Sequence, residues 1–145
     1  MLDAQLASIE KTKVGATLDE IHAASVEVIT AGLVKLGLLS GDVKSLVEAE
    51  AYKPFYMHRT SHWLGMDVHD VGSYFVDGKP RTLQPGMVLT VEPGIYISEK
   101  NDKVPSEYRG IGVRIEDDIV VSSDGPVNLT AAIPKTVEEL RQAMA

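Results

Sequence analysis

Three of the four histidines lie close together in the segment MHRTSHWLGMDVHDVG, with the spacing His58-x3-His62-x6-His69. Imidazole is the commonest metal ligand and the side chain that titrates closest to neutral pH. Any one of these histidines alone would most often be an ordinary polar loop residue. Three of them interleaved with Asp67 and Asp70 favour a metal-binding or catalytic site.

Two glutamates offer carboxylates close to β-rich segments. Glu92 ends the run VLTVE, where burial of a charge requires a partner, and the alternative is a strand end that faces water. Glu116 lies next but one to Arg114 in RIEDD, and the alternative there is an ordinary surface ion pair of little energetic weight. Asp117 and Asp118 are interpreted as turn or supporting residues. Carboxylates on facing strands and a histidine from the preceding loop would suit a hard divalent cation.

Length and composition narrow the class of protein. The 145 residues suit one globular domain, residues 1–145. With 14 Lys+Arg against 21 Asp+Glu, the net charge of -7 argues against nucleic-acid and anionic-membrane partners. The absence of cysteine excludes disulfides, thiolate zinc sites and a cysteine nucleophile. A metal would bind through His, Asp and Glu, which suit Mn, Zn, Co or Fe. No segment resembles a signal peptide or a membrane span, so a cytoplasmic location is expected.

Helices are expected in the first third of the chain. Residues 2–10 have helical apolar spacing. Thr17 and Glu20 match the capping-box pattern T-x-x-E, so a second, longer helix should begin there and end before Gly37. A shorter helix is expected over residues 42–50. The side chains predicted to face inward from the first helix are Leu2, Leu6 and Ile9.

From about residue 55 the sequence indicates strands and loops. Strands are predicted over 88–92, 95–97 and 110–121. The last is expected to be half-buried, with Ile111, Val113 and Ile115 pointing to one side and a polar face on the other. A closing helix follows Pro134. Helices first and strands later, without βαβ alternation, indicate an α+β fold. The apolar stripe expected on the closing helix consists of Val137, Leu140 and Met144.

Three consecutive motifs carry a specific resemblance: HRTSHWLGMDVHDVG, LQPGMVLTVEPGIYI and YRGIGVRIEDDIVV. In this order they resemble the C-terminal motifs of the Xaa-Pro aminopeptidases (aminopeptidase P). That family is a branch of the methionine-aminopeptidase/prolidase superfamily. The similarity runs from about residue 13 to residue 137. It implies the "pita-bread" fold, with helices packed on a mostly antiparallel curved sheet, and release of the N-terminal residue from peptides whose second residue is proline.

The resemblance also implies metal ligands. His62 corresponds to the histidine ligand, Glu92 to a carboxylate ligand that also handles the proton of the attacking water, and Glu116 to the carboxylate that bridges both metals. Two Mn(II)-like ions about 3.5–4 Å apart would activate water and polarise the peptide carbonyl. Zn, Co or Fe are the other metals that such ligands accept.

Further roles follow from the same resemblance. His58 and His69 correspond to histidines that line the substrate pocket and stabilise the tetrahedral intermediate. Arg114 corresponds to an arginine that orients the metal-binding carboxylates. Trp63 and Tyr96 receive no ligand role, and Arg59, where many relatives have glycine, is interpreted as a subgroup feature without consequence for the metals.

The family site has five protein ligands, and the two aspartates among them precede the long helix. Asp3 and Asp19 do not stand in such a context. The chain is therefore expected to be an incomplete, inactive C-terminal part of the catalytic domain, with weak or no metal binding. Exposed apolar surface would favour self-association or docking of the missing N-terminal half. The alternatives are a prolidase that cleaves Xaa-Pro dipeptides and a non-catalytic peptide- or protein-binding module of the same fold.

Overall fold

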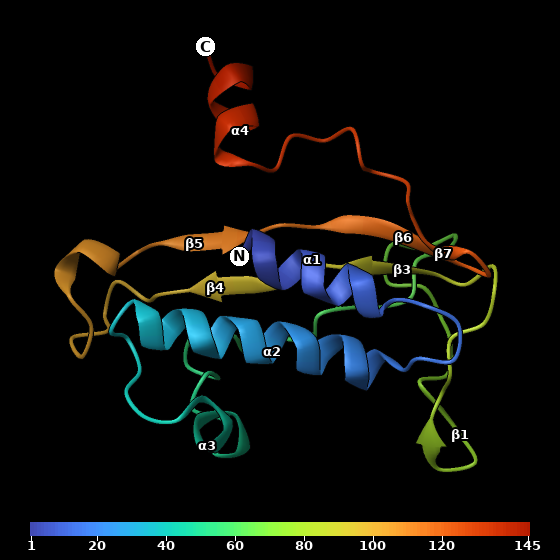
Figure 1. Ribbon diagram of the computed structural model, residues 1–145, viewed down its shortest axis with the longest axis horizontal. Helices are drawn as coiled ribbons and strands as arrows, with labels where there is room; N and C mark the ends of the chain where they lie inside the picture. The colour runs from blue at the N-terminus through green and yellow to red at the C-terminus, as the bar shows by residue number, and fades with distance from the viewer.

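Two antiparallel helices open the chain in the computed structural model, which describes all residues from 1 to 145 (Figure 1). Helix α1 (Leu2–Lys11) is followed by α2 (Leu18–Lys35), and both confirm the prediction. The Thr17 side chain accepts a hydrogen bond from the Glu20 backbone N–H, and the Glu20 side chain accepts one from the Thr17 N–H. This capping box satisfies two of the free N–H groups at the helix start. Gly37, with a φ of 71°, ends the helix as predicted.

The buried face of α1 differs from the predicted one. Leu6 is 53% exposed, whereas Ala4, Gln5 and Ser8 are buried. Small side chains allow α1 to lie close to α2, and the Ser8 hydroxyl donates to the Ile21 carbonyl at 3.2 Å. The prediction that Leu6 faces inward with Leu2 and Ile9 was therefore wrong for Leu6, while Leu2 and Ile9 are half-buried. Close helix packing and a polar contact decide the orientation.

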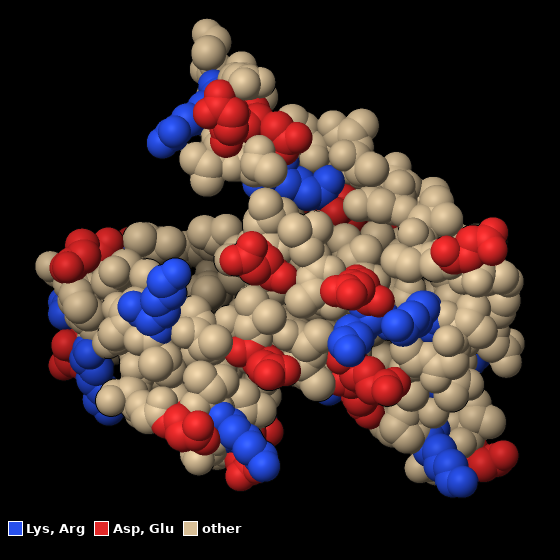
Figure 2. Space-filling view, viewed as in Figure 1, with Lys and Arg blue, Asp and Glu red and all other residues tan.

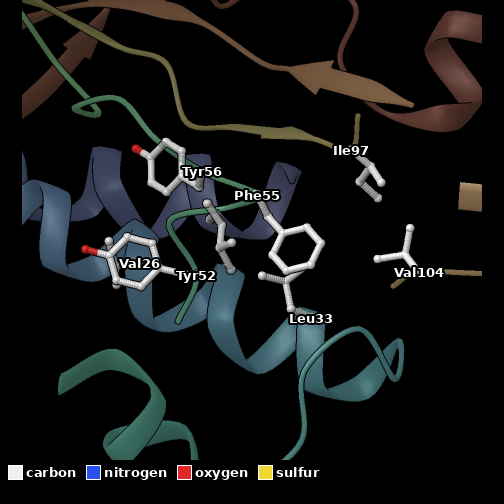
Figure 3. Close-up of a cluster of buried hydrophobic side chains, with 9 residues drawn as sticks. Val26, Leu33, Tyr52, Phe55, Tyr56, Ile97 and Val104 are labelled. Atoms are coloured by element: carbon white, nitrogen blue, oxygen red, sulfur yellow. The ribbon is translucent and has the colours of Figure 1, made fainter. Parts of the chain in front are cut away.

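A mixed aromatic and aliphatic core lies where α2 meets the segment that follows α3 (Val43–Glu48). Figure 3 shows the rings of Tyr52 and Phe55 against Val26 and Leu33 of α2. Ile97 and Val104 of the later loop close the other side of this cluster. The core therefore fixes the chain immediately before the histidine segment onto α2.

Two antiparallel strand pairs follow one another along the chain, β3 (Val88–Val91) with β6 (Asp117–Ser122) and β4 (Gly94–Tyr96) with β5 (Gly112–Arg114), and a short break separates them. Val91 lies opposite Asp117 at the end of one ladder, and Gly94 lies opposite Arg114 at the start of the next. Both ladders keep the same register, so Glu92 faces Glu116 across the break. Strand β7 (Gly125–Asn128) lies beyond β6.

The single strand predicted over 110–121 is two strands, interrupted at Ile115 and Glu116. Its second half, β6, alternates between buried and half-buried residues as expected. Its first half does not, because Ile111 and Val113 are 42% and 41% exposed. Strand β5 pairs only with β4, so no further strand covers its outer edge.

The remaining elements lie at the periphery. The hairpin β1 (Phe75–Val76) and β2 (Lys79–Pro80) projects from one end, and a 3-10 turn spans Ser106–Tyr108. Helix α4 (Val137–Ala143) begins at a capping box, but its apolar residues are exposed. Figure 2 shows α4 standing clear of the main body on one side. The architecture is α+β with antiparallel pairing throughout, as predicted. None of its helices is long and apolar enough to cross a membrane.

Candidate metal centre

Three adjacent chain segments bring one histidine and two glutamates together. Each of His62, Glu92 and Glu116 offers a ligand atom, and these atoms lie within 4.8 Å of one another. Residues 60–64 run beside β3, because the Glu92 N–H donates to the Thr60 carbonyl at 2.8 Å and the Thr90 N–H donates to the His62 carbonyl at 3.1 Å. Strand β3 is thus flanked by the His62 segment and by β6, so the backbone ladders set the spacing of the three side chains.

The protonation of His62 follows from its second ring nitrogen. Nδ1 lies 2.9 Å from the Trp63 carbonyl oxygen, which can only accept, so Nδ1 carries the proton. In the neutral ring, Nε2 then presents a lone pair, and it lies 3.0 Å from Glu92 Oε1. Such fixing of a ring by its outer nitrogen is typical of metal-ligating histidines. Two facing acceptors at this distance require a cation or an added proton between them.

The two carboxylates are held in a site that favours positive charge. Glu92 is buried, accepts a hydrogen bond from the Thr90 hydroxyl at 3.1 Å, and lies 3.4 Å from Arg114 Nη1. Burial, and then the negative charge of Glu92, raise the pKa of the Glu116 carboxyl above its ordinary value. A divalent cation would relieve both effects. The histidine and carboxylate donors therefore fit a hard or borderline metal ion.

A tyrosine without a predicted role joins the site. The Tyr96 hydroxyl accepts from Arg114 Nε at 2.6 Å and lies 3.0 Å from His58 Nε2. Because His58 Nδ1 donates to the Arg59 carbonyl at 2.8 Å, Nε2 is the acceptor of the Tyr96 proton. The hydrogen bond to Tyr96 raises the pKa of Arg114 further, so the guanidinium stays charged. His58 and Arg114 are thus linked through one hydroxyl.

The sequence contains a signal for Tyr96. It lies four residues after Glu92 in an extended chain, and alternation places both on the same face. Gly94, between them, has no side chain, and a Cβ there would collide with the Tyr96 hydroxyl. The same alternation marks Thr90, which contacts Glu92 and the His62 backbone N–H. No comparable pattern in the sequence indicates the buried hydroxyl of Thr60.

The remaining candidates lie in three places around the ligand cluster. The His69 ring lies 4.1 Å from the His62 ring, centroid to centroid, so it belongs to the rim of the site. Asp67 and Asp70 lie outside the ligand cluster. Asp117 is buried behind it, where it accepts hydrogen bonds from Thr130 at 2.5 Å and from Gln5 and pairs with Lys135 at 3.0 Å. It is a structural carboxylate.

The cluster opens into a cavity of about 610 Å³. Apolar side chains of α2 and of the β1–β2 hairpin line one part of it, and histidines and Arg114 line the other. Arg59 is paired with Asp19 at the cavity wall, so this arginine faces the same space as the candidate ligands. The cavity is lined by Leu18, Asp19, His58, Arg59, Ser61, His62, His69, Tyr74, Phe75, Pro80, Glu92 and Arg114.

The antiparallel α+β scaffold holds one histidine and two carboxylates that could bind a metal ion, and comparison with known proteins identifies the family. Residues 1–123 match the model of metallopeptidase family M24, and the chain belongs to that family. Membership implies use of a divalent metal ion. The resemblance inferred from the three motifs and the pita-bread fold are confirmed.

Several relatives are highly similar to the chain over nearly its whole length. The Xaa-Pro aminopeptidases of Escherichia coli K12 and Haemophilus influenzae are 49% and 51% identical over 144 residues. These alignments cover 99% of this chain but 32% and 33% of the relatives. The chain thus spans about a third of their length, in their C-terminal part.

Solved structures give the same result. An aminopeptidase PepP structure of Pseudomonas aeruginosa is 57% identical, with a TM-score of 0.96, and the match covers 99% of this chain and 32% of that one. The structure of aminopeptidase P from E. coli with the inhibitor Pro-Leu is 50% identical, with a TM-score of 0.92 and the same coverage. The fold of these 145 residues is therefore that of the corresponding part of those enzymes.

Proposed function

We propose that residues 1–145 form one domain, the C-terminal part of the catalytic domain of a manganese-dependent Xaa-Pro aminopeptidase. The observation that carries the proposal is the convergence of His62, Glu92 and Glu116, with ligand atoms within 4.8 Å of one another, in an M24 chain. The substrate is a peptide with proline in second position. The relatives named Xaa-Pro aminopeptidase support this specificity.

Each ligand residue is prepared for its role by a neighbour. His62 Nε2 is the metal-binding atom, since Nδ1 is occupied by the Trp63 carbonyl. Glu92 would hold metal and take up a proton from water, and Thr90 and Arg114 orient its carboxylate. Glu116, opposite Glu92, would be the carboxylate shared between the metal ions. When bound, the metal ions would supply Lewis acidity and an activated water.

The substrate side of the site is formed by polar groups that can donate or move protons. His58 and His69 line the cavity and stabilise the charge that develops on the carbonyl oxygen. Arg114 holds the carboxylates and reaches His58 through the Tyr96 hydroxyl. Leu18, Tyr74 and Phe75 provide apolar surface beside these groups, which suits a proline ring.

A chimera tests the proposal. This chain would replace the matching C-terminal third of the E. coli Xaa-Pro aminopeptidase, and release of the N-terminal residue from Xaa-Pro-Yaa tripeptides would be measured with Mn(II). We expect turnover that excess chelator abolishes. Glu116→Gln should lower kcat/KM by about a thousandfold or more, because an amide cannot supply the bridging charge. Glu107→Gln, on an exposed turn, is the matched control.

Two substrates separate the alternatives in the same assay. A prolidase would cleave Xaa-Pro dipeptides in preference to tripeptides, and a binding module would retain peptides without cleaving them. Equal turnover in excess chelator would overturn the metal assignment. Replacing Mn(II) by Zn, Co or Fe in the same protein identifies the metal that gives the highest kcat/KM.

The isolated 145-residue chain should bind Mn(II) weakly and lack peptidase activity, because it supplies three ligands with two negative charges. Calorimetric titration checks the binding. We also propose that its exposed apolar residues on β5 and α4 are covered either by a second copy or by the N-terminal polypeptide of such an enzyme. The cytoplasmic location stays a prediction, which cell fractionation would check.

A further inference from the structure

A buried cluster of hydroxyl groups lies behind the candidate metal centre, on the α2 side. Its centre is Thr60, which is 0% exposed. The Thr60 Oγ1 atom lies 2.8 Å from His22 Nδ1, 2.6 Å from the Ser25 hydroxyl and 2.6 Å from the Tyr56 hydroxyl. Helix α2 supplies two of these partners, and the chain before the histidine segment supplies the third.

Proton accounting over the contacts of 2.8 Å or less gives this cluster one arrangement. The Ser25 and Tyr56 hydroxyls also lie 3.3 Å apart, and in this arrangement neither donates to the other. The Ser25 hydroxyl lies 2.8 Å from the His22 carbonyl, which can only accept, so Ser25 uses its proton there. Thr60 must therefore donate to Ser25. Having spent its one proton, Thr60 accepts from Tyr56 and from His22 Nδ1. The accounting thus assigns the ring proton of His22 to Nδ1.

Thr60 connects this cluster to the ligand segment. It stands two residues after His58 and two before His62. Its carbonyl accepts the Glu92 N–H at 2.8 Å, while its side chain is held by α2. The Tyr56 ring also contacts the His58 ring edge-on, with centroids 5.1 Å apart. The side-chain cluster and the β3 ladder therefore hold the same residue from two directions.

We propose that Thr60 is a positioning residue, whose hydroxyl, held by the Nδ1–H form of His22, fixes the His58–His62 segment between α2 and β3 and so sets the His62–Glu92 distance. This deepens the proposed function, and its effect on metal affinity rests on that function. The proton arrangement and the backbone contact do not, so they are tested separately.

Nitrogen-15 NMR of the metal-free 145-residue chain tests the proton arrangement. Long-range proton–nitrogen spectra should show His22 with its proton on Nδ1 at pH 7.5. A ring protonated on Nε2 alone would overturn the proposal. Amide hydrogen exchange tests the backbone contact, since the Glu92 N–H is bonded to the Thr60 carbonyl. Its exchange should be about tenfold or more faster in Thr60→Val than in the wild type.

A matched set of variants distinguishes positioning from general loss of a buried hydroxyl. Thr30→Val is the control, because Thr30 is also 0% exposed on α2, but its hydroxyl bonds only the Val26 carbonyl of its own helix. Thr60→Ser keeps the hydroxyl, and His22→Asn places an amide near the Nδ1 position. We expect the Glu92 N–H to exchange as slowly in these two variants as in the wild type. It should exchange faster in Thr60→Val and His22→Phe. Equal exchange in Thr60→Val and Thr30→Val would contradict the proposal.

Mn(II) affinity of the chimera, measured by titration, gives the readout at the site. Thr60→Val should weaken binding about ten- to a hundredfold, as loss of groups behind metal ligands typically does, and Thr60→Ser should restore it. Unchanged affinity in folded Thr60→Val would overturn the positioning role. If the unmodified chimera bound no Mn(II), the proposed function would fail, while the NMR and exchange results would still decide the proposal. If Thr60→Val did not fold, the proposal would be decided by other measurements. These are the Glu92 amide exchange in Thr60→Ser and His22→Asn and the position of the His22 ring proton.

Discussion

The strand pair β3–β6 and its continuation β4–β5 share one register but differ in what covers them. In β3–β6, Leu89, Ile119 and Val121 are fully buried, and β7 protects the outer side of β6. In β4–β5, every residue of β5 is exposed. The two facing glutamates stand at the junction. The β3–β6 pair is thus the covered half of the ladder, with its packing completed within these 145 residues. The β4–β5 pair is the open half, because β5 has an exposed edge.

This difference explains how the candidate ligands can be ordered beside an open surface. Glu92 ends the covered half and takes its order from β3 and from residues 60–64. Glu116 precedes the covered strand β6, and the adjacent Asp117 is anchored to α1 by Gln5. The site therefore depends on the covered half, and variants in the two halves should differ in their effects.

The largest effect is expected for a core residue of the covered half. Ile119→Ala should lower the free energy of unfolding by about 2–5 kcal/mol, because it leaves a cavity at a fully buried position of β6. Ile111→Ala, the same change beside β5, should cost less than about 1 kcal/mol, because Ile111 is 42% exposed whereas Ile119 is fully buried. Urea denaturation followed by circular dichroism measures both. Equal losses would mean that β5 is covered in solution.

Loss of the Asp117 anchor comes next. Asp117→Asn should lower the free energy of unfolding by about 2–3 kcal/mol, because it removes the buried charge that faces half-buried Lys135 and disturbs the bonds to Gln5 and Thr130. Burial alone would raise the pKa of Asp117, but the hydrogen bonds from Thr130, Lys135 and Gln5 outweigh it and lower the pKa. The stabilisation is therefore complete above the ordinary carboxyl pKa and is lost as pH falls through the lowered value.

Urea denaturation at pH 7 and pH 3 checks this prediction. The difference in the free energy of unfolding between the wild type and Asp117→Asn should be smaller at pH 3 than at pH 7. Asp118→Asn is the control, because Asp118 is only half-buried and its side chain forms no hydrogen bond within the chain. A gap independent of pH would show that the loss comes from packing rather than from charge.

The features that sequence could predict are those encoded locally. The capping box at Thr17 and Glu20 fixed the start of α2. The three motifs also named His62, Glu92 and Glu116, whose ligand atoms the structure brings within 4.8 Å of one another. Their role as metal ligands stays a prediction. The exposed Leu6 could not be predicted, because the orientation of α1 depends on how closely it approaches α2. Ile111 was expected on the apolar face of a half-buried strand but is 42% exposed, because alternation predicts a pattern but not whether a neighbouring strand exists. Tyr96 and Thr60 act through partners distant in sequence, such as Arg114 and His22.

A smaller effect is expected on acidification. Burial, and then the positive charge of Arg59, lower the pKa of His22 to about 4, against the opposing charge of Asp19. In the unfolded chain His22 binds a proton near pH 6.5, whereas in the folded chain it binds one only near pH 4. The free energy of unfolding should therefore fall as pH drops from 6.5 towards 4. Allowing for solvent screening, the loss is about 1–2 kcal/mol. The groups that also act on this ring are His58 and Lys53.

The comparison of wild type with His22→Asn isolates this contribution, because asparagine does not titrate. Thermal unfolding at pH 7.5, 5.5 and 4.5 should show a steeper decline for the wild type. Parallel declines would assign the acid sensitivity to other groups, and a histidine resonance titrating near pH 6.5 at His22 would contradict its burial.

The smallest effect on the free energy of unfolding is expected at the exposed edge of β5. A substitution there should instead change the self-association of the chain. An exposed strand edge with apolar side chains pairs readily with another chain, and a charge on it prevents this. We expect the 15.7 kDa chain to sediment faster than a monomer as its concentration rises. Val113→Lys should shift it towards the monomer while changing the free energy of unfolding by about 0.5 kcal/mol or less. Val14→Lys is the control, because Val14 is 46% exposed in the loop before α2. If both variants sedimented like the wild type, β5 would not be the associating edge, and α4 would be tested next through Leu140→Glu.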